Sequence, residues 1–151
     1  FGIDCWSIFH RIIAYFLTNP LINEIDTSFP EFGGYWDSIR FLLQHGLNDK
    51  TCEESAKKGY LFAIEYAHEN GCPWNQSTCA NAAKGGNLEC LKYARENNCQ
   101  WDEHVCHDAA YDGHLECLKY THENGCLWDK YTCSSAAAGG HLDCLKYAHE
   151  N

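Results

Sequence analysis

Residues 99–124 read CQWDEHVCHDAAYDGHLECLKYTHEN, and the segments 72–97 and 126–151 repeat that sequence with substitutions. Successive copies begin 27 residues apart, at Cys72, Cys99 and Cys126. Thirteen of the 26 positions carry the same residue in all three copies: Cys72, Trp74, Cys79, Ala82, Ala83, Gly86, Leu88, Cys90, Leu91, Lys92, Tyr93, Glu96 and Asn97, with their equivalents. A repeat of this length predicts a stacked array, in which each unit covers its apolar side only with its neighbours.

Each copy predicts a first helix that carries small residues. In the copy 72–98 this helix spans Ser77 to Lys84 and includes the pair Ala82 and Ala83, which allows close approach of a neighbouring helix. Gly85-Gly86 then ends the helix through a residue in the left-handed conformation.

A second helix follows in each copy. Asn87 stands where an N-cap is expected, and the apolar residues between Leu88 and Ala94 form one stripe. Asn97-Asn98 ends this helix, since Asn often replaces Gly in the left-handed conformation. The connection that follows has the pattern Cys-x-Trp-[Asn/Asp]. Its indole is expected to cover the junction between successive helix pairs, with an aromatic ligand cage as the alternative.

The array extends towards the N-terminus. Residues 51–71 are a fourth, more divergent copy, and 38–46 resembles another second helix. Residues 20–36 contain Pro and Gly and predict an irregular linker or cap. Before them, a helix is expected from Asp4 to Asn19. We therefore divide the chain into a helical cap, 1–36, and a repeat array of four to five units, 37–151. Because the chain lacks Met and begins at Phe1, we expect it to be an internal or trimmed piece, with further repeats after Asn151.

The formal net charge of −10 argues against a nucleic-acid backbone or an anionic membrane as a partner, because both require clustered Lys and Arg. The apolar stretch from Ile3 to Leu17 contains charged residues and is too short for a membrane span. We expect no small-molecule substrate.

Eleven cysteines, an odd number without a signal peptide, fit a reducing cytoplasm better than a secreted disulfide scaffold. Equivalent cysteines of successive repeats would stand about 8–10 Å apart, too far for a bridge. Bridges between cysteines at different positions of the repeat remain open. No Cys-x-x-Cys pair exists, and the nearest cluster, His104-x-Cys106-His107, lacks a second ligand pair, so we expect no metal. The recurrent His68, His122 and His149 become Arg95 in one copy, so they are expected on exposed helix surface without a shared role.

The segments GNLECLKYARENN at 86–98 and GHLECLKYTHENG at 113–125 resemble the second helix of ankyrin repeats, where GHLEVVKLLLENG is typical. Ala82-Ala83-Lys84-Gly85-Gly86 is similar to the Ala-Ala-x-x-Gly of that family. The resemblance covers about 38–151 and implies an all-α fold, an α-solenoid of stacked helix-turn-helix units. The Cys- and Trp-rich variant is most similar to the ankyrin-like families of giant DNA viruses of amoebae and some protists, which implies a host-cytoplasmic location.

Two departures from the family pattern affect the expected fold. The ankyrin period is 33, and the six missing residues fall after Trp74-Asn75 and its equivalents, where ankyrins form a β-hairpin finger. The Thr-Pro-Leu-His motif of the family is also absent. We therefore expect helix pairs joined by tight loops.

Differences among the copies cluster on the first helix and its approach, which is the concave binding face in ankyrin-like stacks. The resemblance thus implies a protein-binding module that contacts its partner through these residues: Gln76, Ser77, Asn81, Lys84, Glu103, His104, His107, Asp108, Tyr111, Lys130, Tyr131, Ser134 and Ser135. The alternative is unselected drift on a solvated surface.

No residue set breaks the repeat in the way that a single active site would, and no phosphate-binding loop or nucleophile elbow is present. We expect no enzyme activity and no cofactor. Two other functions remain open. One is a structural part of a viral particle, with contacts through the outer helix surface. The other is a ubiquitin-ligase adaptor, because the segment from Asp4 to Leu17 is loosely similar to an F-box helix, although such a helix can also simply cap the first repeat.

Overall fold

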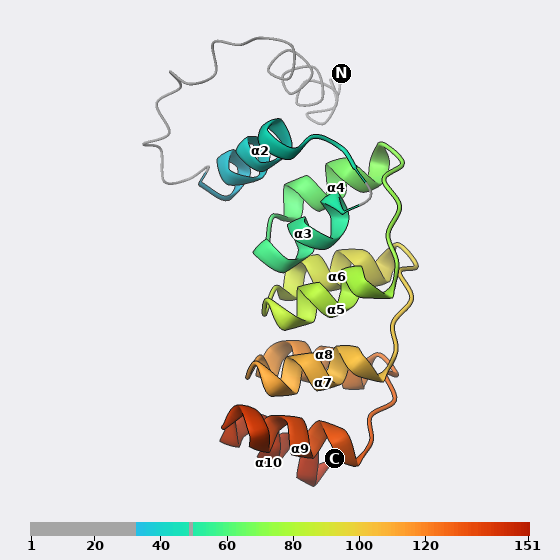
Figure 1. The fold of residues 1–151 in the computed structure, drawn as a ribbon. Coiled ribbons are helices and arrows are strands. Elements are labelled where there is room, and N and C mark those ends of the chain that lie inside the picture. Colours follow the sequence, from blue (N-terminus) through green and yellow to red (C-terminus); the bar gives the residue numbers. More distant parts are fainter. Residues whose placement is uncertain (1–32, 49) are drawn as a thin grey trace, which may run out of the picture.

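The computed structural model describes residues 33–48 and 50–151, and within them the chain forms α-helices and no strand. The helices are α2 (Gly33–His45), α3 (Thr51–Lys58), α4 (Leu61–Glu69), α5 (Gln76–Lys84), α6 (Leu88–Glu96), α7 (Glu103–Tyr111), α8 (Leu115–Glu123), α9 (Lys130–Gly139) and α10 (Leu142–Glu150). Helix pairs follow one another along a stack, joined by tight loops on one side (Figure 1). The predicted all-α solenoid is confirmed. The helix expected from Asp4 and the linker up to residue 32 lie outside the described residues.

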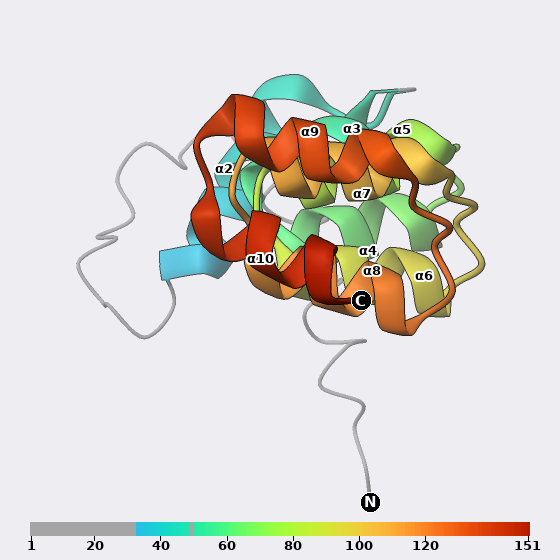
Figure 2. The same cartoon turned by 90° about the horizontal axis from the view of Figure 1, so that it is seen from below.

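The stack has two layers of helices. Seen along the stack, the first helices α3, α5, α7 and α9 form one layer and the second helices α4, α6, α8 and α10 form the other (Figure 2). Successive first helices pack against each other more extensively than successive second helices do. Ala82 and Ala83 on α5 are fully buried, as are their equivalents Ala109 and Ala110 on α7. Small side chains therefore permit the close packing of the first-helix layer.

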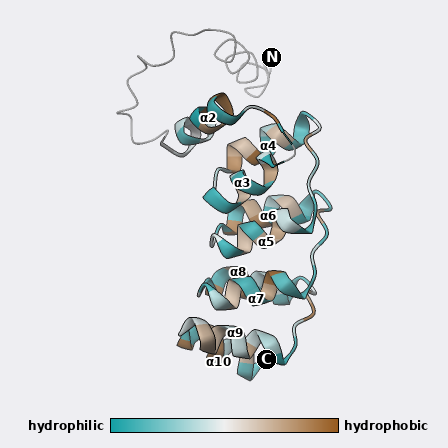
Figure 3. Ribbon diagram, viewed as in Figure 1, coloured by the Kyte–Doolittle hydropathy of each residue, from teal (hydrophilic) through white to brown (hydrophobic). Residues whose placement is uncertain are grey.

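One continuous core runs between the layers. Second helices contribute Ile64, Leu91 and Leu118, all fully buried, and the first helices contribute fully buried cysteines such as Cys79. Each helix combines apolar and hydrophilic residues, as expected of helices with one buried and one exposed side (Figure 3). None of the helices in residues 33–48 and 50–151 is both long and apolar enough to span a bilayer.

The first helix of the array starts earlier than the sequence suggests. A second helix is expected over 38–46 after an irregular linker up to residue 36, but α2 already begins at Gly33. The additional turn is held by packing, because Trp36 lies against a separate cluster that includes Ile39, Phe41 and Phe62. The expected linker is therefore wrong for residues 33–36.

The predicted turns are confirmed. Gly86 at the end of the first helix has φ of 70°, in the left-handed region, as do its equivalents Gly113 and Gly140. After the second helix, Asn98 has φ of 66° and is the one non-glycine residue with positive φ in the described part of the chain. Asn is tolerated there because its short polar side chain lowers the cost of this conformation.

Asn87 does not cap its helix as expected. Its side chain makes no capping hydrogen bond, and Nδ2 donates instead to the carbonyls of Ala56 and Lys57 at 2.8 and 2.9 Å. These carbonyls belong to the end of α3, where a helix leaves its last oxygens without internal partners. His114, at the same position in the next repeat, places Nε2 3.1 Å from the Lys84 carbonyl. The position thus connects α6 and α8 to the first helix of the preceding repeat.

Asn87→Ala is expected to lower the free energy of unfolding by about 1–2 kcal/mol, because the α3 carbonyls lose their donor. Urea denaturation measures the change. Asn87→His is the matched control, since His fills this position in the next repeat, and it is expected to lose less than Asn87→Ala. Equal losses in both variants would contradict the proposed role of this contact.

The indole of each connection covers the junction between helix pairs, as predicted. Trp74 stacks on His68 with ring centroids 3.6 Å apart, and His68 Nδ1 lies 3.3 Å from the hydroxyl of Tyr93 in the next repeat. In the following repeat the guanidinium of Arg95 lies 4.3 Å above the ring of Trp101. His122 stacks on Trp128 in the same way, at 3.9 Å. The expectation of exposed positions without a shared role is therefore wrong for His68, Arg95 and His122, which are half-buried and each stack a planar cation or imidazole on an indole, whereas His149 is exposed as expected.

The stack on Trp74 predicts a pH dependence at one site. Burial against Trp74 and Tyr93 lowers the pKa of His68, and the neighbouring carboxylate of Glu69 opposes this shift. The unfolded chain then binds a proton more readily than the folded chain, so stability is lost as the pH falls below the ordinary value of 6.5. His68→Arg keeps a stacked planar group that does not titrate, as Arg95 does. The difference in unfolding free energy between pH 7.5 and pH 5.5 should be smaller for this variant. An unchanged difference would show that His68 does not contribute to it.

Candidate interaction surface

The residues predicted to contact a partner all lie on the first helices. They are Gln76, Ser77, Asn81 and Lys84 on α5, Glu103, His104, His107, Asp108 and Tyr111 on α7, and Lys130, Tyr131, Ser134 and Ser135 on α9. Each of them is exposed or half-buried, and none belongs to the core. We call this set the first-helix face.

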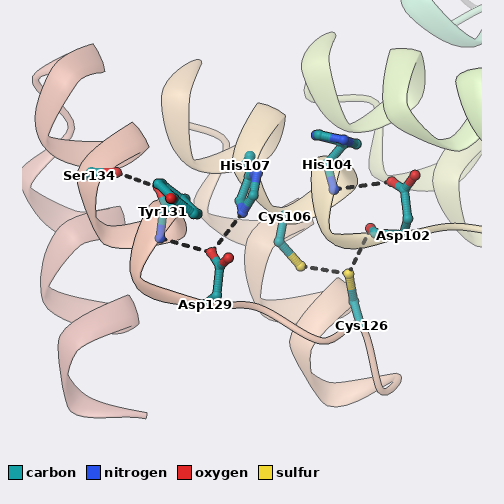
Figure 4. A network of polar contacts seen from close by, with 8 residues as sticks. All are labelled: Asp102, His104, Cys106, His107, Cys126, Asp129, Tyr131 and Ser134. Atoms are coloured by element: carbon teal, nitrogen blue, oxygen red, sulfur yellow. Dashed lines mark hydrogen bonds and ion pairs between the residues drawn. The ribbon is translucent and has the colours of Figure 1, made fainter.

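Its centre is an aromatic cluster that joins α7 to α9. The rings of His104 and His107 lie 5.7 Å apart, one turn from each other on α7. The ring of Tyr131, at the start of α9, lies 6.2 Å from that of His107. Asp129 Oδ1 lies 3.1 Å from His107 Nε2 and accepts the backbone N–H of Tyr131 at 2.8 Å (Figure 4). A single carboxylate therefore holds residues of two neighbouring repeats together.

Two charged residues, Asp129 and Lys130, flank Tyr131 at the start of α9. Desolvation works to raise the pKa of Asp129, but the backbone N–H of Tyr131 and the His107 side chain outweigh it and hold that pKa below its usual range. The Lys130 ammonium lies 5.2 Å from the centre of the Tyr131 ring. Ser134 Oγ donates to the Tyr131 carbonyl at 2.9 Å. The cluster thus offers an aromatic ring bordered by one cation and one anion.

Asp108, on α7, interacts electrostatically with Lys84 on α5. It is half-buried, and burial raises the pKa of its carboxyl group, while the cation of Lys84 on α5 opposes that shift. Tyr111, at the end of α7, is 51% exposed, and Tyr131 is 56% exposed. These two are the large aromatic side chains of this face that are most exposed.

The aspartates that start the first helices α7 and α9 are not among the residues predicted from the sequence. Asp102 and Asp129 cap α7 and α9, where each side chain accepts the backbone N–H two residues later, and Asn75 does the same for α5. The sequence contains the pattern for such a cap, since Asn or Asp directly follows the constant Trp in each copy and both residues are common N-caps. Asp129 in addition positions His107 and Tyr131.

Cys106 and its flanking histidines do not converge on one point. Cys106 is fully buried in the core, whereas His104 is exposed and His107 half-buried on the outside of α7. No group of three or more His, Cys, Asp or Glu side chains within 33–48 and 50–151 is placed to hold a metal ion. His104, Cys106 and His107 therefore lack the geometry of a metal site.

Comparison with known proteins agrees with the fold. Residues 106–149, which run from α7 into α10, match the family model of ankyrin repeats (many copies). This part of the array is similar to ankyrin repeats. No curated protein matches the chain significantly. The connections at 70–75, 97–102 and 124–129 contain no strand, so the array lacks the finger hairpins of longer ankyrin repeats, as its 27-residue period predicts.

Asp129→Ala is expected to lower the free energy of unfolding by about 1 kcal/mol, because α9 loses its cap. Asp129→Asn is the matched control, since Asn75 is a natural cap at this position, and it should cost less. Chemical denaturation of both variants measures the two changes. If the two substitutions have the same effect, the capping role of Asp129 is contradicted.

Proposed function

We propose that this chain is a noncatalytic protein-binding module that contacts its partner through the first-helix face. The observation that carries the proposal is the distribution of differences among the repeats. Positions identical in the three copies include the buried Ala82 and Leu91 and the stacked Trp74, whereas the variable positions that form the first-helix face on α5, α7 and α9 are exposed or half-buried. A scaffold held constant beneath a varied surface is what a binding array requires.

The family resemblance supports the same function. Ankyrin repeats in general mediate protein–protein interactions and are typically noncatalytic. The closer packing of the first-helix layer favours a concave surface on that side, since repeats that approach more closely at one side curve towards it. Because the loops are tight, a partner would contact the helices themselves.

The chemistry of the face points to a mixed polar and aromatic contact. Tyr111 and Tyr131 provide exposed rings, and Glu103, Asp108 and Lys130 provide charges of both signs. Aromatic residues of this kind often dominate binding energy, while the charges around them set orientation and specificity. No feature of the face favours a nucleic-acid backbone, which needs clustered cations.

The test compares two double variants in affinity capture from a cytosolic extract, followed by mass spectrometry and a binding assay with the captured protein. Tyr111→Ala/Tyr131→Ala is expected to weaken binding about 10-fold or more, with helix content unchanged. The control, Lys92→Ala/Lys119→Ala, removes exposed cations from the second helices α6 and α8 and should leave affinity unchanged. Unchanged affinity in the tyrosine variant would contradict binding through the first-helix face.

One observation favours a second candidate, a structural part of a viral particle or assembly. The outer surface of the second helices repeats almost without change, including the Glu89–Lys92 pair at 2.8 Å and the Glu116–Lys119 pair at 2.9 Å. A uniform surface suits permanent contacts of the same kind along the array. Loss of association in the Lys92→Ala/Lys119→Ala variant alone would favour this function over the first.

The finer assignments follow from the resemblance and are part of the proposal. These are a giant-virus origin and a location in the host cytoplasm. The ubiquitin-ligase adaptor would act through the segment from Asp4 to Leu17, which lies outside the described residues.

A further inference from the structure

Three cysteine pairs recur along the stack. In each, a cysteine on a first helix lies against the cysteine that opens the next connection, 20 residues later. Cys106 Sγ is 2.8 Å from Cys126 Sγ (Figure 4). Cys79 Sγ lies 4.0 Å from the Cys99 carbonyl oxygen, and Cys52 Sγ lies 3.9 Å from that of Cys72. Cys52, Cys79, Cys99, Cys106 and Cys126 are unbridged in the structure.

In two of the pairs the second sulfur is held in place by the backbone. Cys99 Sγ donates to the carbonyl of Asn75 at 3.1 Å, and Cys126 Sγ donates to that of Asp102 at 3.2 Å. Asn75 and Asp102 cap α5 and α7, and Cys79 and Cys106 follow them by four residues, about one helical turn. The geometry that brings the sulfurs together therefore repeats with the fold.

The other buried cysteines differ. Cys90 and Cys117 stand on successive second helices, 27 residues apart, at the separation of packed helices, which is too far for a bridge. Burial raises the pKa of Cys90 to about 12 and that of Cys117 to about 11. Cys117 is therefore a matched control for Cys106, equally buried but without a cysteine against its sulfur.

We propose that the pairs Cys79/Cys99 and Cys106/Cys126, and by the same register Cys52/Cys72, are sites of oxidative modification, at which hydrogen peroxide forms a disulfide between a first helix and the cysteine that opens the next repeat. Cys106 attacks the peroxide, so its sulfur takes one oxygen as a sulfenic acid and the other oxygen leaves as water. The Cys126 sulfur then attacks the sulfenic sulfur. The S–S bond forms, the S–O bond breaks, and the oxygen leaves as a second water with the Cys126 proton.

The acidity of the thiols supports this order of steps. The hydrogen-bonding contact with the Cys126 sulfur lowers the pKa of Cys106, and the contact with the Cys79 sulfur lowers the pKa of Cys99. In these two pairs the better thiolate, which is the nucleophilic form, is thus Cys106 in one and Cys99 in the other, whereas burial raises the pKa of Cys52 to about 12. Because these sulfurs are buried, peroxide reaches them during local opening of the repeat.

Each bridge would close a loop that contains the end of a first helix and the whole of the second helix that follows it. The Cys106–Cys126 bridge encloses the end of α7 and all of α8, and it joins α7 to the connection that also carries Asp129. Closing a loop of this length restricts the unfolded chain more than the folded one. Oxidation is therefore expected to stabilise the array.

The experiment exposes the folded protein to hydrogen peroxide, alkylates the remaining thiols, and maps the peptides by mass spectrometry without reduction. The expected result is a Cys106–Cys126 link and a Cys79–Cys99 link, with Cys90 and Cys117 recovered as alkylated thiols. The melting temperature should rise by roughly 10 °C and return to its starting value with dithiothreitol.

Two variants test the proposal further. Cys126→Ala is expected to lose the 106–126 link, to keep the 79–99 link and to gain less in melting temperature on oxidation. Cys117→Ala is expected to form the same links as the parent chain and to show the same rise in melting temperature on oxidation. If Cys126→Ala fails to fold, the peptide map of the parent chain decides alone. Recovery of Cys106 as a free or over-oxidised thiol, links scattered among the other cysteines, or a lower melting temperature after oxidation would each overturn the proposal.

Discussion

Each helix pair of this chain can bury its apolar side only against the pairs before and after it, because two short helices enclose no core of their own. The same residue therefore changes its exposure with its place in the stack. Ala83 and Ala110 are fully buried by the pair that follows them, whereas Ala137, on α9, is exposed. Leu118 is likewise fully buried, whereas its equivalent Leu145 on α10 is only half-buried. Contact between neighbouring repeats thus determines whether a repeat has a core.

The repeats keep those contacts while exchanging the side chains that make them. Asn87 and His114 both reach carbonyls at the end of the first helix of the preceding repeat. His68 and Arg95 both stack on the indole of the next connection, one as an imidazole and one as a guanidinium. The geometry of the junction is therefore more constant than its residues. The exposed positions of α5, α7 and α9 take part in fewer of these junction contacts, which leaves them freer to vary.

Spacing within one copy was enough to predict the helix pairs, the left-handed turns at Gly86 and Asn98, and the indole at the junction. It was not enough for the roles of Asn87 and His68. Their partners lie 31 and 25 residues away in the neighbouring repeat, and which residues meet there depends on the offset between stacked pairs. The early start of α2 was missed for a related reason, because packing against α4 holds its first turn. The first-helix face itself remains a prediction, although α7 and α9 bring several of its members into contact.

The central claim is that a constant scaffold carries an interchangeable first-helix surface. The most direct test transplants the variable residues of α5 onto α7, in the substitutions Glu103→Gln, His104→Ser, His107→Ala, Asp108→Asn and Tyr111→Lys, and measures the free energy of unfolding by urea denaturation. If the scaffold is independent of this surface, the free energy of unfolding is expected to change by no more than about 1 kcal/mol, close to the usual range for surface substitutions. Loss of several kcal/mol, or of cooperative unfolding, would contradict the separation of scaffold from binding surface.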